Sequence, residues 1–314
     1  MALAETDGML VIAGFVLLML GGEFVVQGAI TIANRLKVPP LLIGFTVVAI
    51  GTSLPELAVV LEAVSEGTPE IAVGAVLGSN VANVMLVLGT AALLGAASDP
   101  GPGIRRDAIA VAVATVILLA AVLIGEIASQ FGVLMLLGLA AYYTYSYRAS
   151  KADGNDVEDS KSWLPDNVKL AIPTTVAGGY MIWTGAQMLV EGATGLAIDY
   201  GISESVIGLS IVALGTSLPE LAVTLVAGLR GQGGVAIGNV LGSNVINILG
   251  ILGVASTYAG GLIVAPEFAV RDIWIVVLTS GFIVAMLLDE RHIGRRVGAT
   301  MVAGYLAYMV FLYL

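Results

Sequence analysis

The sequence IGFTVVAIGTSLPELAV at residues 43–59 is repeated as IGLSIVALGTSLPELAV at residues 207–223, an offset of 164. A second pair has the same offset, with GAVLGSNVANVMLVLG at 74–89 and GNVLGSNVINILGILG at 238–253. A duplication kept only for architecture would not require identical polar and charged residues in both copies. The repeat therefore predicts one helical unit used twice, with the same chemistry in each half.

The composition is typical of a membrane protein. Of 314 residues, 58% are apolar and 11% are charged, and the mean hydropathy is +0.99. These values lie outside the range of water-soluble globular domains. The absence of cysteine excludes disulfides, thiolate metal sites and cysteine nucleophiles. The net charge of −10 argues against a nucleic-acid partner, so we expect the lipid bilayer as partner and no obligate protein partner.

Ten apolar segments are long enough to cross a bilayer, which takes about 20 residues each. They are 9–33, 39–63, 70–98, 106–125, 127–147, 168–198, 202–229, 233–260, 271–288 and 297–314. We therefore predict an all-α integral membrane protein with ten transmembrane helices. The polar stretch 149–166 is predicted to be a cytoplasmic linker between a five-helix repeat at 1–148 and a second one at 167–314.

Lys and Arg are predicted to lie almost entirely on one side of the membrane. With the amino terminus outside, only Arg271 lies outside, in agreement with the positive-inside rule. The cytoplasmic ones are Arg35, Lys37, Arg105, Arg106, Arg148, Lys151, Lys161, Lys169, Arg230, Arg291, Arg295 and Arg296. Five spans separate the two copies, so the second repeat is inverted relative to the first, as in many secondary transporters. Both termini are then extracytoplasmic, in a multi-pass protein of the cell membrane.

Proline interrupts the helix in each copy of GTSLPE. The ring of Pro55 crowds the carbonyl of Gly51, and Pro219 crowds that of Gly215, so each helix should break or kink there. Within a membrane, freed carbonyls must find partners in the protein or line a polar cavity. Oxygen ligands of this kind suit hard cations such as Na⁺ and Ca²⁺. The candidates are the carbonyls of Ala49 and Ala213 and the hydroxyls of Thr52, Ser53, Thr216 and Ser217.

The acids Glu56 and Glu220 directly follow these prolines, in the first turn of the half-helix that resumes after the break. There the unsatisfied N–H groups and the helix dipole favour negative charge. Acids within a membrane span are functional candidates by default. Two ionised carboxylates near the midplane repel each other strongly unless a cation lies between them. We therefore expect a divalent cation, or two monovalent ones, between Glu56 and Glu220.

The GSNxxN element adds neutral ligands. Ser79 and Asn83 in one copy, like Ser243 and Asn247 in the other, are four residues apart and share a helix face. Asparagine offers a carbonyl oxygen to a cation without adding charge. The same element contains GxxxG pairs, which predict close approach of a neighbouring helix. These glycines are Gly74, Gly78, Gly238 and Gly242.

With its doubled GTSLPE and GSNxxN motifs, the chain resembles the cation/Ca²⁺ exchanger superfamily, the group of sodium/calcium exchangers, and most closely its short prokaryotic members. The resemblance covers the whole chain. It implies four ion sites between the second, third, seventh and eighth spans, and first and sixth spans that slide to alternate access. One departure is Asn247, because some relatives have an aspartate there, which leaves open the involvement of protons or K⁺.

The resemblance also implies a role for each motif residue. Glu56 and Glu220 correspond to the central acids shared by Ca²⁺ and Na⁺. The inner Na⁺ site corresponds to Thr52, Ser53 and the carbonyl of Ala49, and the outer one to Thr216, Ser217 and the carbonyl of Ala213. The middle is completed by Asn83 and Asn247, with Ser79 and Ser243 alongside.

The predicted function is secondary-active antiport, most simply extrusion of Ca²⁺ by exchange with Na⁺. Exchange of H⁺ for Ca²⁺, transport of another cation and coupling to K⁺ remain open alternatives. A cation channel is disfavoured because channels usually assemble their pathway from several subunits, whereas one chain here supplies both halves of a midplane site. No histidine set or nucleophile–base pair indicates an enzyme, and we expect no cofactor beyond the transported ions.

A few other polar residues invite a functional interpretation. Glu23 and Gln27 correspond to Gln187 and Glu191 across the repeat, with acid and amide exchanged. They are either gate groups or, as we expect, residues near the water interface or paired with each other. No metal site is expected at the single histidine, His292. The acidic residues at 153–159 lack the spacing of a Ca²⁺-binding loop.

Overall fold

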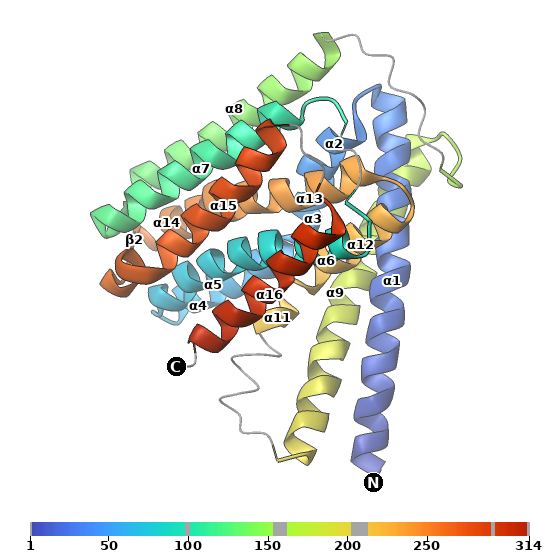
Figure 1. The fold of residues 1–314 in the computed structure, drawn as a ribbon, viewed down its shortest axis with the longest axis horizontal. Coiled ribbons are helices and arrows are strands. Elements are labelled where there is room, and N and C mark those ends of the chain that lie inside the picture. Colours follow the sequence, from blue (N-terminus) through green and yellow to red (C-terminus); the bar gives the residue numbers. More distant parts are fainter. Residues whose placement is uncertain (1, 98–100, 153–161, 202–212, 290–292, 313–314) are drawn as a thin grey trace.

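The computed structural model describes residues 2–97, 101–152, 162–201, 213–289 and 293–312. Nearly all of them are helical (Figure 1). The first half contains α1 (Ala2–Leu36), α2 (Pro40–Ile43), α3 (Ala49–Thr52), α4 (Leu54–Ser65), α5 (Pro69–Ala82), α6 (Gly89–Leu93), α7 (Ile104–Ile124) and α8 (Ser129–Ala152). Two π-helical segments, η1 (Gly44–Val48) and η2 (Asn83–Leu88), connect α2 to α3 and α5 to α6 without interrupting the helical path.

The second half contains corresponding elements. They are α9 (Val168–Asp199), α11 (Ala213–Gly215), α12 (Leu218–Leu229), α13 (Gly233–Val245), η4 (Ile246–Ile251), α14 (Leu252–Ala259), η5 (Phe268–Asp272), α15 (Ile273–Leu288) and α16 (Arg295–Leu312). Among the described residues, five helices are long and apolar enough to cross a membrane, and six if the bent stretch Pro40–Ser65 is one span. These helices confirm the prediction of a mainly helical membrane protein.

Helices α1 and α9 lie side by side and extend together beyond the rest of the bundle (Figure 1). Glycines allow their backbones to touch. A Cβ atom at Gly14 would collide with the carbonyl of Gly185, and one at Gly21 with that of Gly178; the reverse additions collide as well. Small residues at these positions permit close helix packing within a membrane. Helix α1 also contacts α12, which joins the α1–α9 pair to the remaining helices.

Helix α13 lies at the centre of the bundle. A Cβ atom at Gly238 or Gly242 would collide with backbone atoms between Leu41 and Phe45, so the predicted close approach is confirmed in the second copy. The prediction is wrong for the first copy. Gly74 faces only the ring of Phe268, and a Cβ at Gly78 would meet open space. The two GxxxG pairs have the same spacing but different neighbours.

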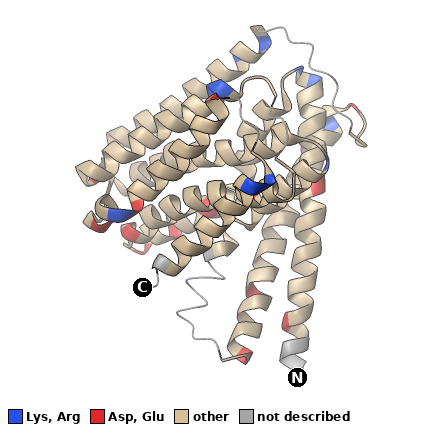
Figure 2. Ribbon diagram, viewed as in Figure 1, with Lys and Arg blue, Asp and Glu red and all other residues tan. Residues whose placement is uncertain are grey.

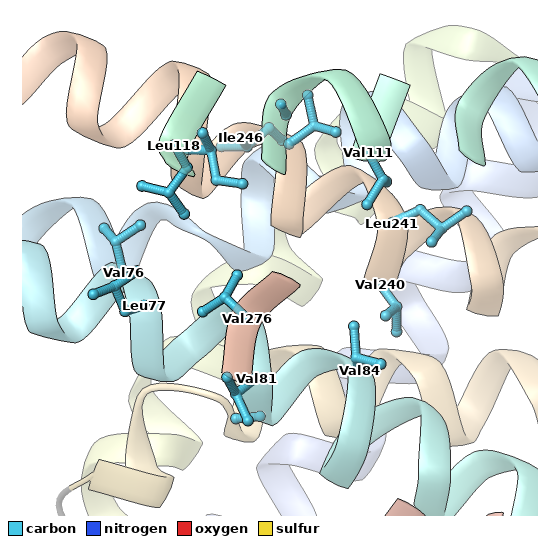
Figure 3. Close-up of a cluster of buried hydrophobic side chains, with 14 of the residues drawn as sticks. Val76, Leu77, Val81, Val84, Val111, Leu118, Val240, Leu241, Ile246 and Val276 are labelled. Atoms are coloured by element: carbon cyan, nitrogen blue, oxygen red, sulfur yellow. The ribbon is translucent and has the colours of Figure 1, made fainter. Parts of the chain in front are cut away.

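Branched aliphatic side chains fill the space around α13 (Figure 3). Val76 and Val81 of α5 and Val84 of η2 belong to the same buried cluster as Val240 of α13 and Val276 of α15. Because these residues are almost wholly inaccessible, they fix the positions of α5 and α13 relative to each other. These two helices carry the GSNxxN motifs.

A small antiparallel sheet corrects the all-α expectation. Strand β1 (Glu126–Ala128) pairs with β2 (Gly261–Ile263), with Ile127 opposite Leu262. Gly125 and Gly260 adopt positive φ and end the preceding helices α7 and α14. The short segments that follow then satisfy their backbone groups by pairing with each other. The sheet connects the end of α7 to the end of α14.

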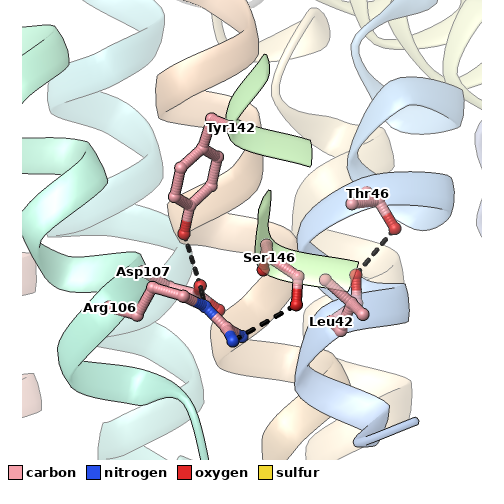
Figure 4. Close-up of polar contacts among 6 residues, drawn as sticks. All are labelled: Leu42, Thr46, Arg106, Asp107, Tyr142 and Ser146. Carbon is pink, nitrogen blue, oxygen red and sulfur yellow. Dashed lines mark hydrogen bonds and ion pairs between the residues drawn. The ribbon is translucent and has the colours of Figure 1, made fainter. Parts of the chain in front are cut away.

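A buried polar network that the sequence patterns did not indicate connects the ion pair Arg106–Asp107 of α7 to Tyr142 and Ser146 of α8 (Figure 4). The carboxyl group of Asp107 is fully buried, and its Oδ1 accepts hydrogen bonds from Tyr142 Oη at 2.5 Å and Arg106 Nε at 3.2 Å. Arg106 Nη1 donates to the carbonyl of Ser146 at 3.3 Å. A charge in apolar surroundings needs such partners. The network therefore acts as a structural connection between α7 and α8.

Replacing Asp107 by Ala should destabilise the protein, because the guanidinium of Arg106 then loses its buried counter-ion. Breaking a buried pair costs on the order of 3–5 kcal/mol. We expect a clearly lower thermal unfolding midpoint in detergent for Asp107→Ala than for Glu62→Ala, which alters an exposed acid of α4. Equal midpoints for the two variants would contradict a structural role for the Asp107 network.

Candidate functional site

Both copies of GTSLPE contain a helix break, as the prolines predict. The segment Pro40–Thr52 and helix α4 meet at an angle of 43°. Ser53 at the junction has φ −88° and ψ 4°, and Ser217 in the second copy has φ −91° and ψ 1°. Pro55 and Pro219 lie in the first turns of α4 and α12, where proline is well tolerated. The two copies thus break at the same residue with the same backbone conformation.

The carbonyl of Ala49 is less free than the proline argument suggests. It accepts the Ser53 N–H at 3.0 Å and the Thr52 hydroxyl at 3.3 Å. In the second copy, the Ser217 N–H donates to the carbonyl of Leu214 at 3.1 Å, one residue later than the α-helical partner Ala213. The two carbonyls therefore differ in their hydrogen bonding, and their role as ligands stays a prediction.

The acids Glu56 and Glu220 project from the first turns of α4 and α12 and are buried, with 4% and 0% of their surfaces exposed. Ser53, three residues before Glu56, lies 3.3 Å from Glu220 Oε1, so the two GTSLPE motifs meet at these acids. Glu56 Oε1 accepts from Ser79, whereas Glu220 Oε1 accepts from Ser53 and Ser243. The second oxygen of each acid, Oε2, is buried without a hydrogen-bond partner. The structure thus brings the two predicted acids together.

Three hydroxyl groups contact these acids at long distances, and a fourth lies against one of the three. The Oγ of Ser53 is 3.3 Å and that of Ser243 is 3.4 Å from Glu220 Oε1; Thr52 Oγ1 is 3.4 Å from Ser243 Oγ, and Ser79 Oγ is 3.5 Å from Glu56 Oε1. Hydroxyl hydrogen bonds are usually about 2.7–2.8 Å long. Oxygens that share a cation at roughly 2.3–2.6 Å lie about 3.3–3.7 Å apart when they are adjacent. The contacts are long hydrogen bonds, and their spacing is also compatible with oxygens that share one cation.

We refer to the carboxyl groups of Glu56 and Glu220 and the hydroxyl groups of Thr52, Ser53, Ser79 and Ser243 as the oxygen cluster. Of the second GTSLPE copy, Ser217 is buried and its hydroxyl has no hydrogen-bond partner, and Thr216 is partly buried. The hydroxyls of the first copy therefore belong to the oxygen cluster, and the role of Thr216 and Ser217 stays a prediction.

Asn83 and Asn247 of the two GSNxxN motifs have amide atoms without a hydrogen-bond partner. Both amide atoms of Asn83 are buried without partners; Asn247 donates from Nδ2 to Ser79 Oγ at 3.2 Å, and its Oδ1 is unpartnered. They lie in the π-helical segments η2 and η4, and such segments are frequent at functional sites. Buried amides in proteins are usually hydrogen-bonded to protein or to ordered water, and an amide oxygen without a protein partner can accept a ligand. Asn83 and Asn247 therefore fit the predicted role of neutral cation ligands.

Another asparagine, Asn239, was not indicated by the motifs. It is fully buried in α13 and accepts a hydrogen bond from Thr52 Oγ1 at 3.1 Å. The one signal in the sequence is a departure from the repeat, because the first copy has Ala75 at the corresponding position. At this position, the difference between the two copies of the repeat coincides with a contact to the oxygen cluster.

Glu23 lies in a separate network. Its Oε2 pairs with Arg230 at 2.8 Å, and its Oε1 accepts from Trp163 Nε1 and from Gln27, both at 3.0 Å. Glu23 and Gln27 are thus paired within α1, and the network connects α1 to the end of α12. Gln187 and Glu191 are exposed. His292 and the acidic residues at 153–159 lie outside the described residues.

The charge of the oxygen cluster is small. Within the described ranges, no group of three or more His, Cys, Asp and Glu side chains is placed to hold a metal ion. The negative charge at the cluster therefore comes from Glu56 and Glu220, and the other ligands are neutral. This combination balances one divalent or two monovalent cations.

Comparison with known proteins gives consistent matches over the whole chain. A family model for sodium/calcium exchanger proteins matches residues 8–148 and 170–314. The chain is 34% identical over 307 residues to the putative antiporter CaxA of Alkalimonas amylolytica, covering 96% of this chain and 95% of that relative. It is 31% identical over 349 residues to the sodium/calcium exchanger MaX1 of Methanosarcina acetivorans, with coverages of 97% and 98%.

The fold is also similar to that of a solved membrane exchanger. A structure of the sodium-calcium exchanger NCX_Mj, soaked with zero Na⁺ and Ca²⁺, superimposes with a TM-score of 0.81 at 30% sequence identity. The superposition covers 98% of this chain and 99% of that chain. The similarity therefore includes both halves of the molecule and is not limited to the repeated motifs.

Replacing either acid of the oxygen cluster by glutamine should abolish stabilisation by Ca²⁺. Glu56→Gln and Glu220→Gln each remove half of the negative charge, and with it the repulsion between the carboxyl groups. We expect an unfolding midpoint in chelator at least as high as that of the wild type, and no rise when Ca²⁺ is added. A ligand at about 100 times its Kd would otherwise add about 2.7 kcal/mol.

The matched control is Glu267→Gln, which changes an exposed acid away from the oxygen cluster. This variant should show the same Ca²⁺-dependent rise as the wild type. If Glu56→Gln or Glu220→Gln kept that rise, the two acids would not be cation ligands.

Proposed function

Because the chain belongs to the sodium/calcium exchanger protein family, whose members are transporters and not enzymes, we propose that it is an antiporter that extrudes Ca²⁺ by using the inward Na⁺ gradient. The observation that carries this proposal is the oxygen cluster around Glu56 and Glu220. Its two carboxylates and neutral hydroxyl and amide oxygens are the ligand set that hard cations prefer. The same oxygens would bind Ca²⁺ and Na⁺ in turn.

Competition between the two ions follows from charge. One Ca²⁺ neutralises Glu56 and Glu220, and two Na⁺ ions do the same. A third Na⁺ would leave one net positive charge on the loaded site, so exchange of three Na⁺ for one Ca²⁺ would be electrogenic. An unneutralised pair of buried carboxylates is costly, so the protein with an empty site should switch slowly between its inward-open and outward-open states. Slow switching of the empty protein favours exchange over uniport.

The architecture supports alternating access. We propose ten transmembrane helices in two inverted repeats, at 1–148 and 167–314, with the linker 149–166 and both termini placed as the positive-inside rule predicts. The matching helix breaks and the π-helical segments η2 and η4 support this arrangement. Figure 2 shows most Lys and Arg toward the end of the molecule where α1 and α8 finish. We assign that end to the cytoplasm.

A small cavity indicates how ions could reach the oxygen cluster. Its volume is about 40 Å³, and its lining includes Thr52, Pro55 and Pro219 on one side and Gly179 and Ile182 of α9 on the other. A displacement of the α1–α9 pair would change this cavity directly. We propose that such a displacement opens the cluster to one side of the membrane at a time, since α1 and α9 are packed tightly to each other.

Exchange of H⁺ for Ca²⁺ is the second candidate. It is favoured by Asn247, because a site with two acids and no third one can be neutralised by two protons. The hydroxyl oxygens of the oxygen cluster favour Na⁺, since protons need no cage of such oxygens. The driving ion therefore distinguishes the two candidates.

We expect purified protein in Na⁺-loaded vesicles to take up Ca²⁺ when the vesicles are diluted into Na⁺-free buffer. Glu56→Gln and Glu220→Gln should lower the initial rate to background, whereas Glu267→Gln should transport like the wild type. The measurement is uptake of radioactive Ca²⁺ with and without a Na⁺ ionophore. Uptake that follows an imposed pH gradient and ignores Na⁺ would replace this proposal by H⁺/Ca²⁺ exchange.

A further inference from the structure

We propose that Asn239 is a positioning residue that turns the hydroxyl proton of Thr52 away from the oxygen cluster and so makes Thr52 Oγ1 a dedicated cation acceptor. This inference rests on the proposed function, because it assigns Thr52 a place in cation binding. It adds a residue that belongs to neither the GTSLPE nor the GSNxxN motif. Asn239 acts through Thr52 and need not touch the ion itself.

The orientation of the Asn239 amide is fixed by its partners. Its Nδ2 donates to the backbone carbonyl of Glu220 at 3.3 Å and to Thr224 Oγ1 at 3.1 Å. A carbonyl oxygen can only accept, so the nitrogen of the amide must face Glu220. The amide oxygen Oδ1 is then left to face Thr52. Both hydrogens of Nδ2 are used, and the amide cannot flip without placing two acceptors against each other.

The fixed amide determines where the Thr52 proton lies. A threonine hydroxyl has one proton and two lone pairs. Asn239 Oδ1, 3.1 Å away, accepts this proton more closely than the carbonyl of Ala49 at 3.3 Å. With the proton directed to Asn239, the lone pairs of Thr52 Oγ1 are available on the side of Ser243 Oγ, which itself contacts Glu220 Oε1. Thr52 can then bind a cation without turning its proton toward it.

Without Asn239, the Thr52 hydroxyl would keep only the more distant carbonyl of Ala49 as an acceptor outside the oxygen cluster, so its proton would turn toward the cluster more easily. The hydroxyl would then act as a donor to its neighbours, and a cation would have to reorient it before binding. The loss is comparable to the net contribution of one hydrogen bond, which corresponds to about a three- to tenfold change in affinity.

The arrangement occurs in one half of the chain only. At the offset of 164, Asn239 corresponds to Ala75 and Thr224 corresponds to Val60. Neither Ala nor Val carries a polar side chain, so the first repeat cannot provide the same amide network to Thr216, the counterpart of Thr52. Both polar members of the network are present in the second repeat and both are absent from the first. The two GTSLPE threonines are therefore predicted to differ in ion binding despite their identical motifs.

The test combines Asn239→Ala, which copies the residue of the first repeat, with changes at each threonine. We expect Asn239→Ala to raise the half-saturating Ca²⁺ and Na⁺ concentrations about three- to tenfold, with a smaller change in maximal uptake rate. In a Thr52→Val background the same change should have no further effect, because the group that Asn239 positions is gone. In a Thr216→Val background it should keep its full effect.

Half-saturation is measured in two ways, by uptake into Na⁺-loaded vesicles and by the Ca²⁺-dependent rise of the unfolding midpoint in detergent. Equal effects in the two threonine backgrounds, or an unchanged half-saturating concentration, overturn the inference. If Asn239→Ala does not fold, Thr224→Val takes its place, since it removes one partner of the amide. It should give a smaller rise that disappears with Thr52→Val, and no rise overturns the inference.

The two readouts separate this inference from the proposed function. Wild-type vesicles without Na⁺-driven uptake would contradict Na⁺/Ca²⁺ exchange. The unfolding midpoint would still show whether Ca²⁺ binding depends on Asn239 through Thr52. Normal wild-type exchange with an unaffected Asn239→Ala variant would remove the role of Asn239 and leave the proposed function in place.

Discussion

Two carboxyl groups buried next to each other, those of Glu56 and Glu220, are the constraint on which the rest of the structure depends. Each lies in the first turn of a half-helix, where the dipole offsets part of its charge. The remainder must be balanced by something that enters, because the surrounding oxygens and amides are neutral. The helix breaks bring both acids to the starts of half-helices, and neutral hydroxyl groups donate hydrogen bonds to them.

The features that the sequence predicts well are those determined by short segments. Pro55 and Pro219 predict the breaks, and the spacing of Ser79 and Asn83 predicts one helix face, because both depend on backbone geometry within a few residues. The repeat adds a further constraint, since whatever holds in one copy is expected in the other. The sequence alone therefore predicted that both helices break at the motif and that both acids lie in the first turn after the break.

The features that the sequence does not predict depend on which segments meet. Thr52 and Asn239 are far apart in the chain and belong to opposite repeats, and neither periodicity nor spacing indicates their contact. The same holds for Asp107 with Tyr142, and for the pairing of β1 with β2. The GxxxG pairs illustrate the same limit of sequence-based prediction, because the motif does not determine which copy packs closely. Gly242 touches a backbone and Gly78 does not, because identical motifs have different neighbours in the two halves.

Differences between the halves have a physical meaning if the repeats are inverted. Equivalent groups then approach opposite faces of the membrane, which differ in ion concentration and potential. The equilibrium of exchange is fixed by the number of ions moved and is unaffected by which half binds more tightly, since affinity changes on the two sides must balance around a cycle. The transport rates do depend on affinity, because transport from each face is fastest when the affinity there is near the ion concentration on that side. Asn239 and Thr224 in place of Ala75 and Val60 alter one half without changing a motif residue, and thereby adjust affinity while the charge balance at Glu56 and Glu220 stays the same.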